Sequence, residues 1–211
     1  MNYLAHAYLA SYSDAAMVGA LLGDFAKADV WTKYPPEIAL EIVVHRQIDS
    51  YTDRHPMVQQ ALRHFPGPRR RFGGIVLDVF YDHILSQRWA TFSAVPRVQF
   101  IGQFYAALQA HEPILPERLR ALLPSLIGQD WLTRYHEMDG VDWAITRMSQ
   151  RLSKNGEILR ACLDNAHASY AELAAGFDTF FPELVVFAND ARARVLAARA
   201  ANTAPVAVTF C

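Results

Sequence analysis

The sequence is short of cysteine, of net charge and of long apolar runs, and each shortage excludes a class of protein. Cys162 and Cys211 are the only cysteines among 211 residues, so neither a disulfide framework nor a Cys-x-x-Cys zinc site is present. A net charge of −1 gives no global field for nucleic-acid binding. No apolar run reaches the ~18 residues of a membrane span, and the first residues lack a basic signal-peptide segment. We therefore expect a cytoplasmic protein that binds neither membranes nor nucleic acid.

Apolar residues at helical spacing dominate the rest of the sequence. Hydrophobic residues make up 52% and charged residues 19%, which is typical of a globular protein. No convincing strand is visible, since the β-branched run at 42–44 lies within a helical pattern. The sequence predicts an all-α protein with one helical domain over residues 1–200 and a flexible C-terminal tail over 201–211.

Helix starts can be placed from capping residues and prolines. Asn2 is a candidate cap for a first short helix, and Ser13 for a second that runs to about residue 26. Prolines 35 and 36 open a third, and Pro56 a fourth. After a turn at 64–68, a long segment extends to about residue 90. Further helical stretches follow Pro96, Pro116, Gln129, Lys154 and about Pro182.

Histidines and aspartates gather in the first 83 residues. This part of the chain holds His6, His45, His55, His64, His83, Asp24, Asp49, Asp53, Asp78 and Asp82. Residues three, four or seven apart share one helix face, so His45 points the same way as Asp49. Asp78 and Asp82 form a second such pair, with His83 turned about 100° from Asp82.

Several of these polar residues lie among apolar neighbours. Asp78 stands between Leu77 and Val79, and Asp24 follows an apolar stretch. Carboxylates are seldom buried unless they are paired or bind metal, so these positions predict one inward-facing metal cluster. Imidazole with carboxylate suits Mn²⁺, Fe²⁺ or Zn²⁺, and a carboxylate-rich set suits Mn²⁺ or Mg²⁺. The alternatives are satisfied core histidines, helix caps and buried ion pairs with Arg46 or Arg88.

A basic run, Arg69, Arg70 and Arg71, comes just before the segment that contains Asp78. Such a run is most simply a solvated turn. It also suits a phosphate clamp or a docking patch for an acidic partner, because the guanidinium group offers a fork of donors.

Four separated motifs carry a resemblance to a known family. MNYLAHAYLA, VGALLGDF, HRQIDSYTD and LDVFYDHILSQRW occur in this order within residues 1–90. Together they closely resemble the acyl carrier protein phosphodiesterases, and the resemblance extends to roughly residue 190. That family is related to the HD phosphohydrolases. It removes the 4′-phosphopantetheine arm from the serine of holo-acyl carrier protein, using Mn²⁺.

The resemblance implies an HD-like helical fold and a metal centre. YLAH followed by ALLGD looks like the first histidine and the His-Asp doublet of HD enzymes, except that Gly23 stands where the doublet has histidine. Asp24 is retained, and His45 is our candidate for the missing ligand. Asp78 or Asp82 corresponds to the later aspartate of the HD pattern. The predicted ligands of Mn²⁺, with Mg²⁺ or Fe²⁺ as alternatives, are His6, Asp24, His45 and Asp78.

The resemblance also implies a mechanism and a partner. The predicted catalytic residues are His83, Asp82, Arg46 and Asp49, with His83 as general acid and Arg46 stabilising charge on the phosphate. Acyl carrier proteins are acidic, so residues 69–71 are expected to dock the substrate. Two alternatives remain. One is an HD-type hydrolase of nucleotides such as guanosine tetraphosphate, and the other is a non-catalytic helical binding protein.

Overall fold

The computed structural model describes residues 2–27 and 29–203. Within these ranges no residue lies in a β-strand, which confirms the all-α prediction. The first half of the chain forms α1 (Tyr3–Leu9), α2 (Asp14–Leu22), α3 (Val30–Lys33), α4 (Pro36–Arg54), α5 (Pro56–Ala61), α6 (Arg70–Gln87) and α7 (Trp89–Phe92). The second half forms α8 (Arg97–Ala110), α9 (Glu117–Gly128), α10 (Trp131–Arg134), α11 (Met138–Arg151), α12 (Gly156–Ala168) and α13 (Tyr170–Thr203). Short 3₁₀ turns lie at Leu62–His64, Gly67–Arg69 and Glu112–Ile114.

The first two helices begin with different kinds of cap. Ser13 caps α2 as predicted, since its hydroxyl accepts a hydrogen bond from the Ala16 N–H at 3.0 Å. Asn2 precedes α1, but its side chain makes no capping hydrogen bond. The carboxylate of Asp82 on α6 takes that place and accepts the N–H groups of Leu4 and Ala5 at 2.9 and 3.0 Å. The start of α1 is therefore fixed by a residue distant in sequence.

Two glycines let α2 and α4 approach each other closely. A Cβ atom at Gly19 would lie 2.6 Å from the Ile38 carbonyl oxygen and 2.9 Å from the Glu41 Cβ. One turn later, a Cβ at Gly23 would overlap the ring of His45. Because Ser13 also donates to Glu37 at the start of α4, contacts advance together along both helices, which therefore run parallel.

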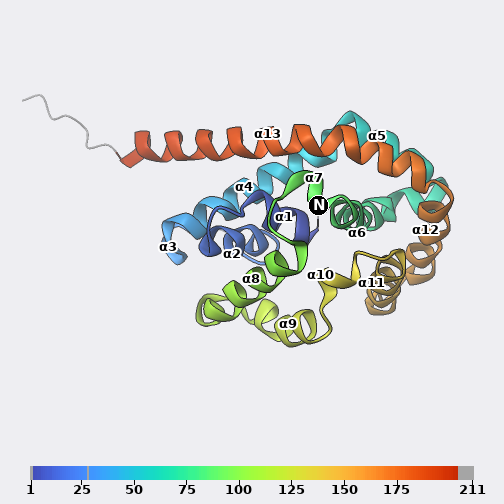
Figure 1. The fold of residues 1–211 in the computed structure, drawn as a ribbon, viewed down its shortest axis with the longest axis horizontal. Helices are drawn as coiled ribbons and strands as arrows, with labels where there is room; N and C mark the ends of the chain where they lie inside the picture. The colour runs from blue at the N-terminus through green and yellow to red at the C-terminus, as the bar shows by residue number, and fades with distance from the viewer. Residues whose placement is uncertain (1, 28, 204–211) are drawn as a thin grey trace, which may run out of the picture.

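The longest helix, α13, lies along the top of the molecule over α4, α5 and α6 (Figure 1). Its 34 residues span about 50 Å. Arg192 anchors its second half to Glu41 of α4, with Nε 2.5 Å from Oε1, and also donates to the Leu9 carbonyl at 2.7 Å. The Glu41 side chain is only 1% exposed, so this pair neutralises a charge that would otherwise be buried alone.

Aromatic rings fill the space between α13 and α6. Phe177 and Phe181 of α13 stack with their centroids 4.8 Å apart, and Tyr81 of α6 packs against Phe177 at 5.5 Å. The helix start predicted near Pro182 was wrong, because Pro182 lies inside α13. Burial of the rings on both sides of it offsets the loss of one backbone hydrogen bond.

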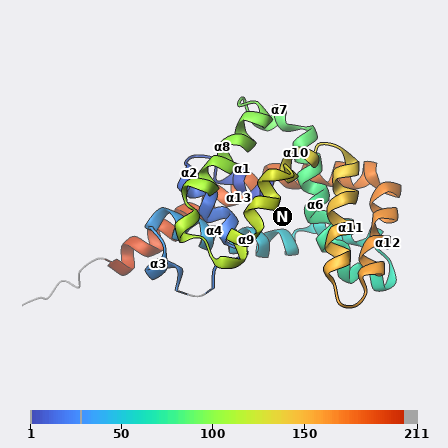
Figure 2. The same cartoon turned by 90° about the horizontal axis from the view of Figure 1, so that it is seen from below.

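The remaining helices form the other end of the molecule. Figure 2 shows α11 and α12 side by side next to α6, with α9 and α10 to their left. No described helix is long and apolar enough to cross a membrane. The helix α13 continues to Thr203, three residues beyond the predicted domain end, and the rest of the predicted tail, 204–211, lies outside the described residues.

Candidate functional site

Two helices and one turn bring two histidines and two aspartates together. His6 lies on α1, His45 and Asp49 lie one turn apart on α4, and Asp24 follows the end of α2. The two imidazole rings stack with centroids 3.8 Å apart and planes inclined by 22°. We call His6, Asp24, His45 and Asp49 the His-Asp cluster.

The Asp49 carboxylate bridges both histidines of the cluster. Its Oδ1 lies 3.1 Å from Nε2 of His6, and its Oδ2 lies 3.0 Å from Nε2 of His45. The carboxylate of Asp24 approaches His45 Nε2 from another side at 3.4 Å. Both histidines are almost fully buried, whereas the Asp24 and Asp49 side chains are 44% and 38% exposed. The carboxylates therefore form the solvent side of the cluster.

The cluster gives its two histidines opposite protonation states. Burial and the neighbouring His45 lower the pKa of His6 to about 4, so His6 is neutral at pH 7. Burial also acts to lower the pKa of His45, but hydrogen bonds to Asp24 and Asp49 outweigh it and raise this pKa to about 9. The same contacts hold the pKa values of both carboxyls below their ordinary range, although burial opposes this. Without another cation, the charged form of His45 offsets one of the two carboxylate charges and leaves the cluster with an excess of negative charge.

The donors of the cluster fit a divalent ion. One ligand atom from each of His6, His45 and Asp49 lies within 4.8 Å of the other two, and Asp24 lies outside this group of three but adjoins it through its 3.4 Å contact with His45. The Nδ1–H group of His45 donates to the Ala20 carbonyl at 2.6 Å, which orients its Nε2 toward the carboxylates, as metal-bound histidines require. Two imidazoles with carboxylate oxygens suit Mn²⁺, Fe²⁺ or Zn²⁺. Such an ion would supply the positive charge that the His45 proton supplies in its absence.

Gly23 makes room for this arrangement. A Cβ atom at residue 23 would lie 2.1 Å from Cγ and 2.6 Å from Cβ of His45. The backbone of Gly23 is right-handed helical, with φ −50° and ψ −37°, so it needs glycine for space rather than for conformation. The ring of His45 thus occupies the volume that a histidine at position 23 would need.

The two aspartates predicted on α6 are placed differently. Asp78 is half-buried and close enough to Asp49 for their charges to interact, yet it is not part of the group whose ligand atoms lie within 4.8 Å. Burial raises the pKa of the Asp78 carboxyl. Asp82 is fully buried and accepts the N–H groups at the start of α1, and burial raises its pKa to about 7 despite these bonds. Asp82 therefore positions His6 through the start of α1.

Two other predicted catalytic residues make contacts outside the cluster. His83 is buried, with Nδ1 2.9 Å from the Tyr135 carbonyl oxygen and Nε2 2.9 Å from the Tyr170 hydroxyl. Burial lowers its pKa. Arg46 is exposed and donates to the carbonyls of Ala26 and Lys27, so it holds the turn after Asp24. Arg88, an alternative partner for the aspartates, pairs instead with Asp178.

The arginine run divides in two. Arg69 donates to the Asn165 amide oxygen at 2.7 Å and lies 3.9 Å from Asp164, so it joins α6 to α12. Arg70 and Arg71 are exposed at the start of α6. Arg71 lies seven residues before Asp78 and therefore on the same face of the helix.

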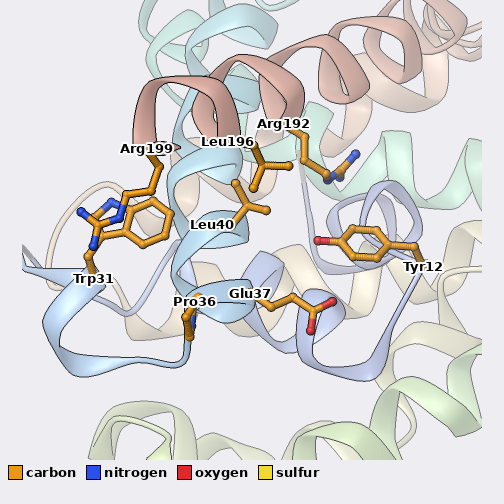
Figure 3. A pocket seen from close by; sticks show the side chains of 8 residues that line it. All are labelled: Tyr12, Trp31, Pro36, Glu37, Leu40, Arg192, Leu196 and Arg199. Carbon is orange, nitrogen blue, oxygen red and sulfur yellow. The ribbon is translucent and has the colours of Figure 1, made fainter. Parts of the chain in front are cut away.

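A hollow of about 460 Å³ lies between α13 and the start of α4 (Figure 3). Figure 3 shows Leu40 and Leu196 on its walls, with Tyr12 and Arg192 at one end and Trp31 and Arg199 at the other. Glu37 lines it eight residues before His45, which is about 12 Å along the helix. This hollow contributes no group to the His-Asp cluster.

Comparison with known proteins gives the family. The family model for acyl carrier protein phosphodiesterase matches residues 1–184. Curated proteins named acyl carrier protein phosphodiesterase from Salmonella agona, Salmonella newport and Salmonella heidelberg are each 35% identical over 186 residues, covering 88% of this chain and 96% of the relative. The chain belongs to the acyl carrier protein phosphodiesterase family. No solved structure matches it.

Membership in this family confirms the predicted enzyme class, a phosphodiesterase and therefore a hydrolase. The match covers every helix that contributes to the His-Asp cluster, and it ends within α13. Asp49 was predicted as a catalytic residue, whereas its position between the two histidines makes it a candidate ligand. Its four-residue spacing from His45 was the signal that puts both side chains on one helix face.

We predict that Gly23→Ala in this phosphodiesterase displaces the His45 ring. The added methyl group overlaps the imidazole, so we expect a loss of about 1–3 kcal/mol in the free energy of unfolding and a loss of divalent-ion binding. Urea unfolding and ion titration calorimetry measure both effects. Gly102→Ala in α8 is the control, because no atom lies within 4 Å of its added Cβ. Unchanged ion binding in Gly23→Ala would contradict the assigned geometry.

We also predict that the metal-free enzyme loses stability above neutral pH. The pKa of His45 is about 9 in the folded protein and about 6.5 in an unfolded chain. A group whose pKa is raised by folding stabilises the folded state fully at pH values below its pKa in the unfolded chain. This stabilisation is lost as the pH rises through its pKa in the folded protein. We expect the free energy of unfolding in EDTA to fall by about 2–3 kcal/mol between pH 7 and about pH 9.5, discounted for the exposed carboxylates. His45→Gln should flatten this dependence, and an equally steep fall in that variant would refute its origin in His45.

Proposed function

We propose that the protein hydrolyses holo-acyl carrier protein to apo-acyl carrier protein and 4′-phosphopantetheine, with a divalent ion held by the His-Asp cluster. The family match supports the reaction class and the carrier protein as substrate. The close approach of His6, His45 and Asp49 supports the ion. Mn²⁺ is the ion we favour, because the set mixes imidazole with carboxylate oxygens.

The reaction exchanges one phosphorus–oxygen bond for another. A water oxygen bonds to phosphorus, the bond from phosphorus to the serine oxygen of the carrier breaks, and a proton from the water ends on that serine oxygen. A divalent ion at the cluster would supply hydroxide at neutral pH and offset charge on the phosphate.

The chain's own residues would hold and orient that ion. His6 is neutral, and the Nδ1–H···O=C bond of His45 to Ala20 fixes the direction of its Nε2. Asp24 and Asp49 supply negative charge on the exposed side of the cluster, where substrate arrives. Asp78 lies near enough to act on Asp49 electrostatically and is a further candidate ligand. We expect substrate to approach the carboxylate side, since both histidines are covered by protein.

Arg70 and Arg71 are the proposed docking residues for the acidic carrier protein. Both are exposed, whereas Arg69 is engaged with α12 and contributes less. Arg71 shares a face of α6 with Asp78, which places positive charge about 10 Å along the helix from the site. Charge complementarity of this kind steers encounter and fixes orientation.

Mass spectrometry of the carrier protein tests the proposed reaction. We expect holo-acyl carrier protein to lose the phosphopantetheine mass when it is incubated with enzyme and Mn²⁺, and to keep it in EDTA. His45→Gln and Asp24→Asn should lose Mn²⁺ binding and at least about a hundredfold in activity, because each removes a ligand. Asp190→Asn, a matched change at an exposed position of α13, should behave as wild type.

An unchanged carrier mass at high enzyme concentration would refute the proposed reaction. Full activity in EDTA after exhaustive dialysis would refute the proposed requirement for a divalent ion, but not the proposed substrate.

Charge reversal tests the docking residues. We expect Arg70→Glu/Arg71→Glu to raise KM for holo-acyl carrier protein about tenfold at low salt, and to weaken the salt dependence of KM, because screening has less attraction to remove. The value of kcat and the affinity for Mn²⁺ should not change. Arg120→Glu/Arg194→Glu carries the same change in net charge at other exposed positions and serves as the control. An equal rise in KM in both double variants would show a general charge effect rather than a docking site.

A further inference from the structure

A second hollow, of about 410 Å³, lies next to the His-Asp cluster. Its walls include Tyr3, Phe25, Arg118, Trp131, Met148 and Arg151. These residues come from α1, from the turn after α2, and from α9, α10 and α11. The volume lies within the range of small-molecule sites, about 300–1,000 Å³. We call it the α9–α11 hollow.

Two of its wall residues are sequence neighbours of the cluster. Tyr3 lies one helical turn before His6 on α1, and Phe25 directly follows Asp24. The charges of Asp24, Arg118 and Arg151 all act on the Tyr3 hydroxyl, whose pKa burial raises to about 12. The hollow therefore begins where the cluster ends.

The hollow has an excess of positive charge. Arg118 and Arg151 come from different helices and line the same space. Neither guanidinium group forms an ion pair within the part of the chain that the structure describes. The Arg118 guanidinium carbon lies 5.4 Å from the centre of the Phe25 ring, which keeps it beside Asp24. Two arginines without an ion pair, close to the His-Asp cluster, are suited to binding a phosphate group.

The rest of the wall is apolar but has one unused donor. Phe25, Trp131 and Met148 offer aromatic and thioether surface. Trp131 is only 6% exposed, and its Nε1–H group has no hydrogen-bond partner among the described residues. A smaller hollow of about 30 Å³ shares Trp131, Met148 and Arg151 with this one, so Trp131 separates two spaces. A buried donor without an acceptor is costly, and a ligand carbonyl would satisfy it.

We propose that the α9–α11 hollow binds the 4′-phosphopantetheine arm, with Arg118 and Arg151 on the phosphate and Trp131 donating to an amide carbonyl of the arm. The arm joins an anionic phosphate to a gem-dimethyl group and two amides, groups that suit the arginines, the apolar wall and the indole donor of the hollow. This inference rests on the proposed function, and it assigns contacts to the arm's phosphate beside the cluster and to the rest of the arm. Arg118, Trp131 and Arg151 are positioning residues in this scheme.

Calorimetry with free 4′-phosphopantetheine and the Mn²⁺-loaded full chain tests the hollow without turnover. We expect Arg118→Gln/Arg151→Gln to weaken binding about tenfold or more, since each arginine makes charge-assisted hydrogen bonds. Pantetheine, which lacks the phosphate, should bind wild type and this double variant alike. Trp131→Phe, which removes only the donor, should weaken both ligands by about threefold to tenfold. Arg120→Gln on the exposed face of α9 is the control and should bind as wild type.

Affinity for Mn²⁺ separates this hollow from the cluster. The double arginine variant should keep that affinity and show a raised KM for holo-acyl carrier protein. Suppose that the wild type cleaves the carrier and the double variant binds 4′-phosphopantetheine normally. This result would overturn the proposal that the hollow binds the arm, and the proposed function would stand. Wild type that binds 4′-phosphopantetheine through these arginines but never cleaves the carrier would overturn the proposed function instead. Wild type that binds no 4′-phosphopantetheine at millimolar concentration would overturn the hollow whatever its activity.

Discussion

The close packing of α2 against α4 is the constraint on which the candidate metal centre depends. Gly19 and Gly23 lie one turn apart on the same face of α2, and a Cβ atom at either position would overlap α4. Without this approach His45 could not reach the Ala20 carbonyl with Nδ1, and its Nε2 would not be directed at Asp24 and Asp49. The absence of a side chain at position 23 thus determines where the His45 ring, twenty-two residues later, can lie. Gly23 replaces the histidine of the HD doublet, and His45 is the candidate for the missing ligand. Both features follow from the same packing of α2 on α4, because the His45 ring fills the space beside Gly23.

Electrostatics then determines what the packed site can hold. Two carboxylates face two imidazoles, and burial keeps one imidazole neutral while the carboxylates keep the other charged. A buried imidazolium is unfavourable unless close negative partners offset its desolvation. The raised pKa of His45 therefore shows that the electrostatic potential at this site is strongly negative. The Glu41–Arg192 pair one turn earlier on α4 shows the contrasting case. There the buried carboxylate already has its own guanidinium partner, so no excess charge remains for an ion.

The sequence was sufficient for the fold class and for part of the site, and the reason lies in the range of each interaction. Four-residue spacing places His45 and Asp49 on one face because it depends only on helix geometry. The same rule placed Asp78, Asp82 and His83 on α6, yet it could not say which neighbour each would meet. The α1 helix brings backbone N–H groups to Asp82, and α10 and α13 bring Tyr135 and Tyr170 to His83. Those contacts join segments 52 to 87 residues apart, and no local pattern specifies them.

In the proposed scheme, chemistry and recognition are divided between the two halves of the chain. The His-Asp cluster comes from the first 49 residues, whereas Arg118, Trp131 and Arg151 of the α9–α11 hollow come from a stretch with no spacing signal of its own. Tyr3 and Phe25 line the hollow, and each lies within three residues of a cluster member in the sequence. A substrate whose arm lies in this hollow would gain binding energy from Trp131 and the apolar wall, which are remote from the reacting phosphorus, and that energy would help orient the phosphodiester. On this proposal, changes in α9–α11 would alter which arm is accepted, while the packing of α2 on α4, and with it the candidate metal centre, stays intact.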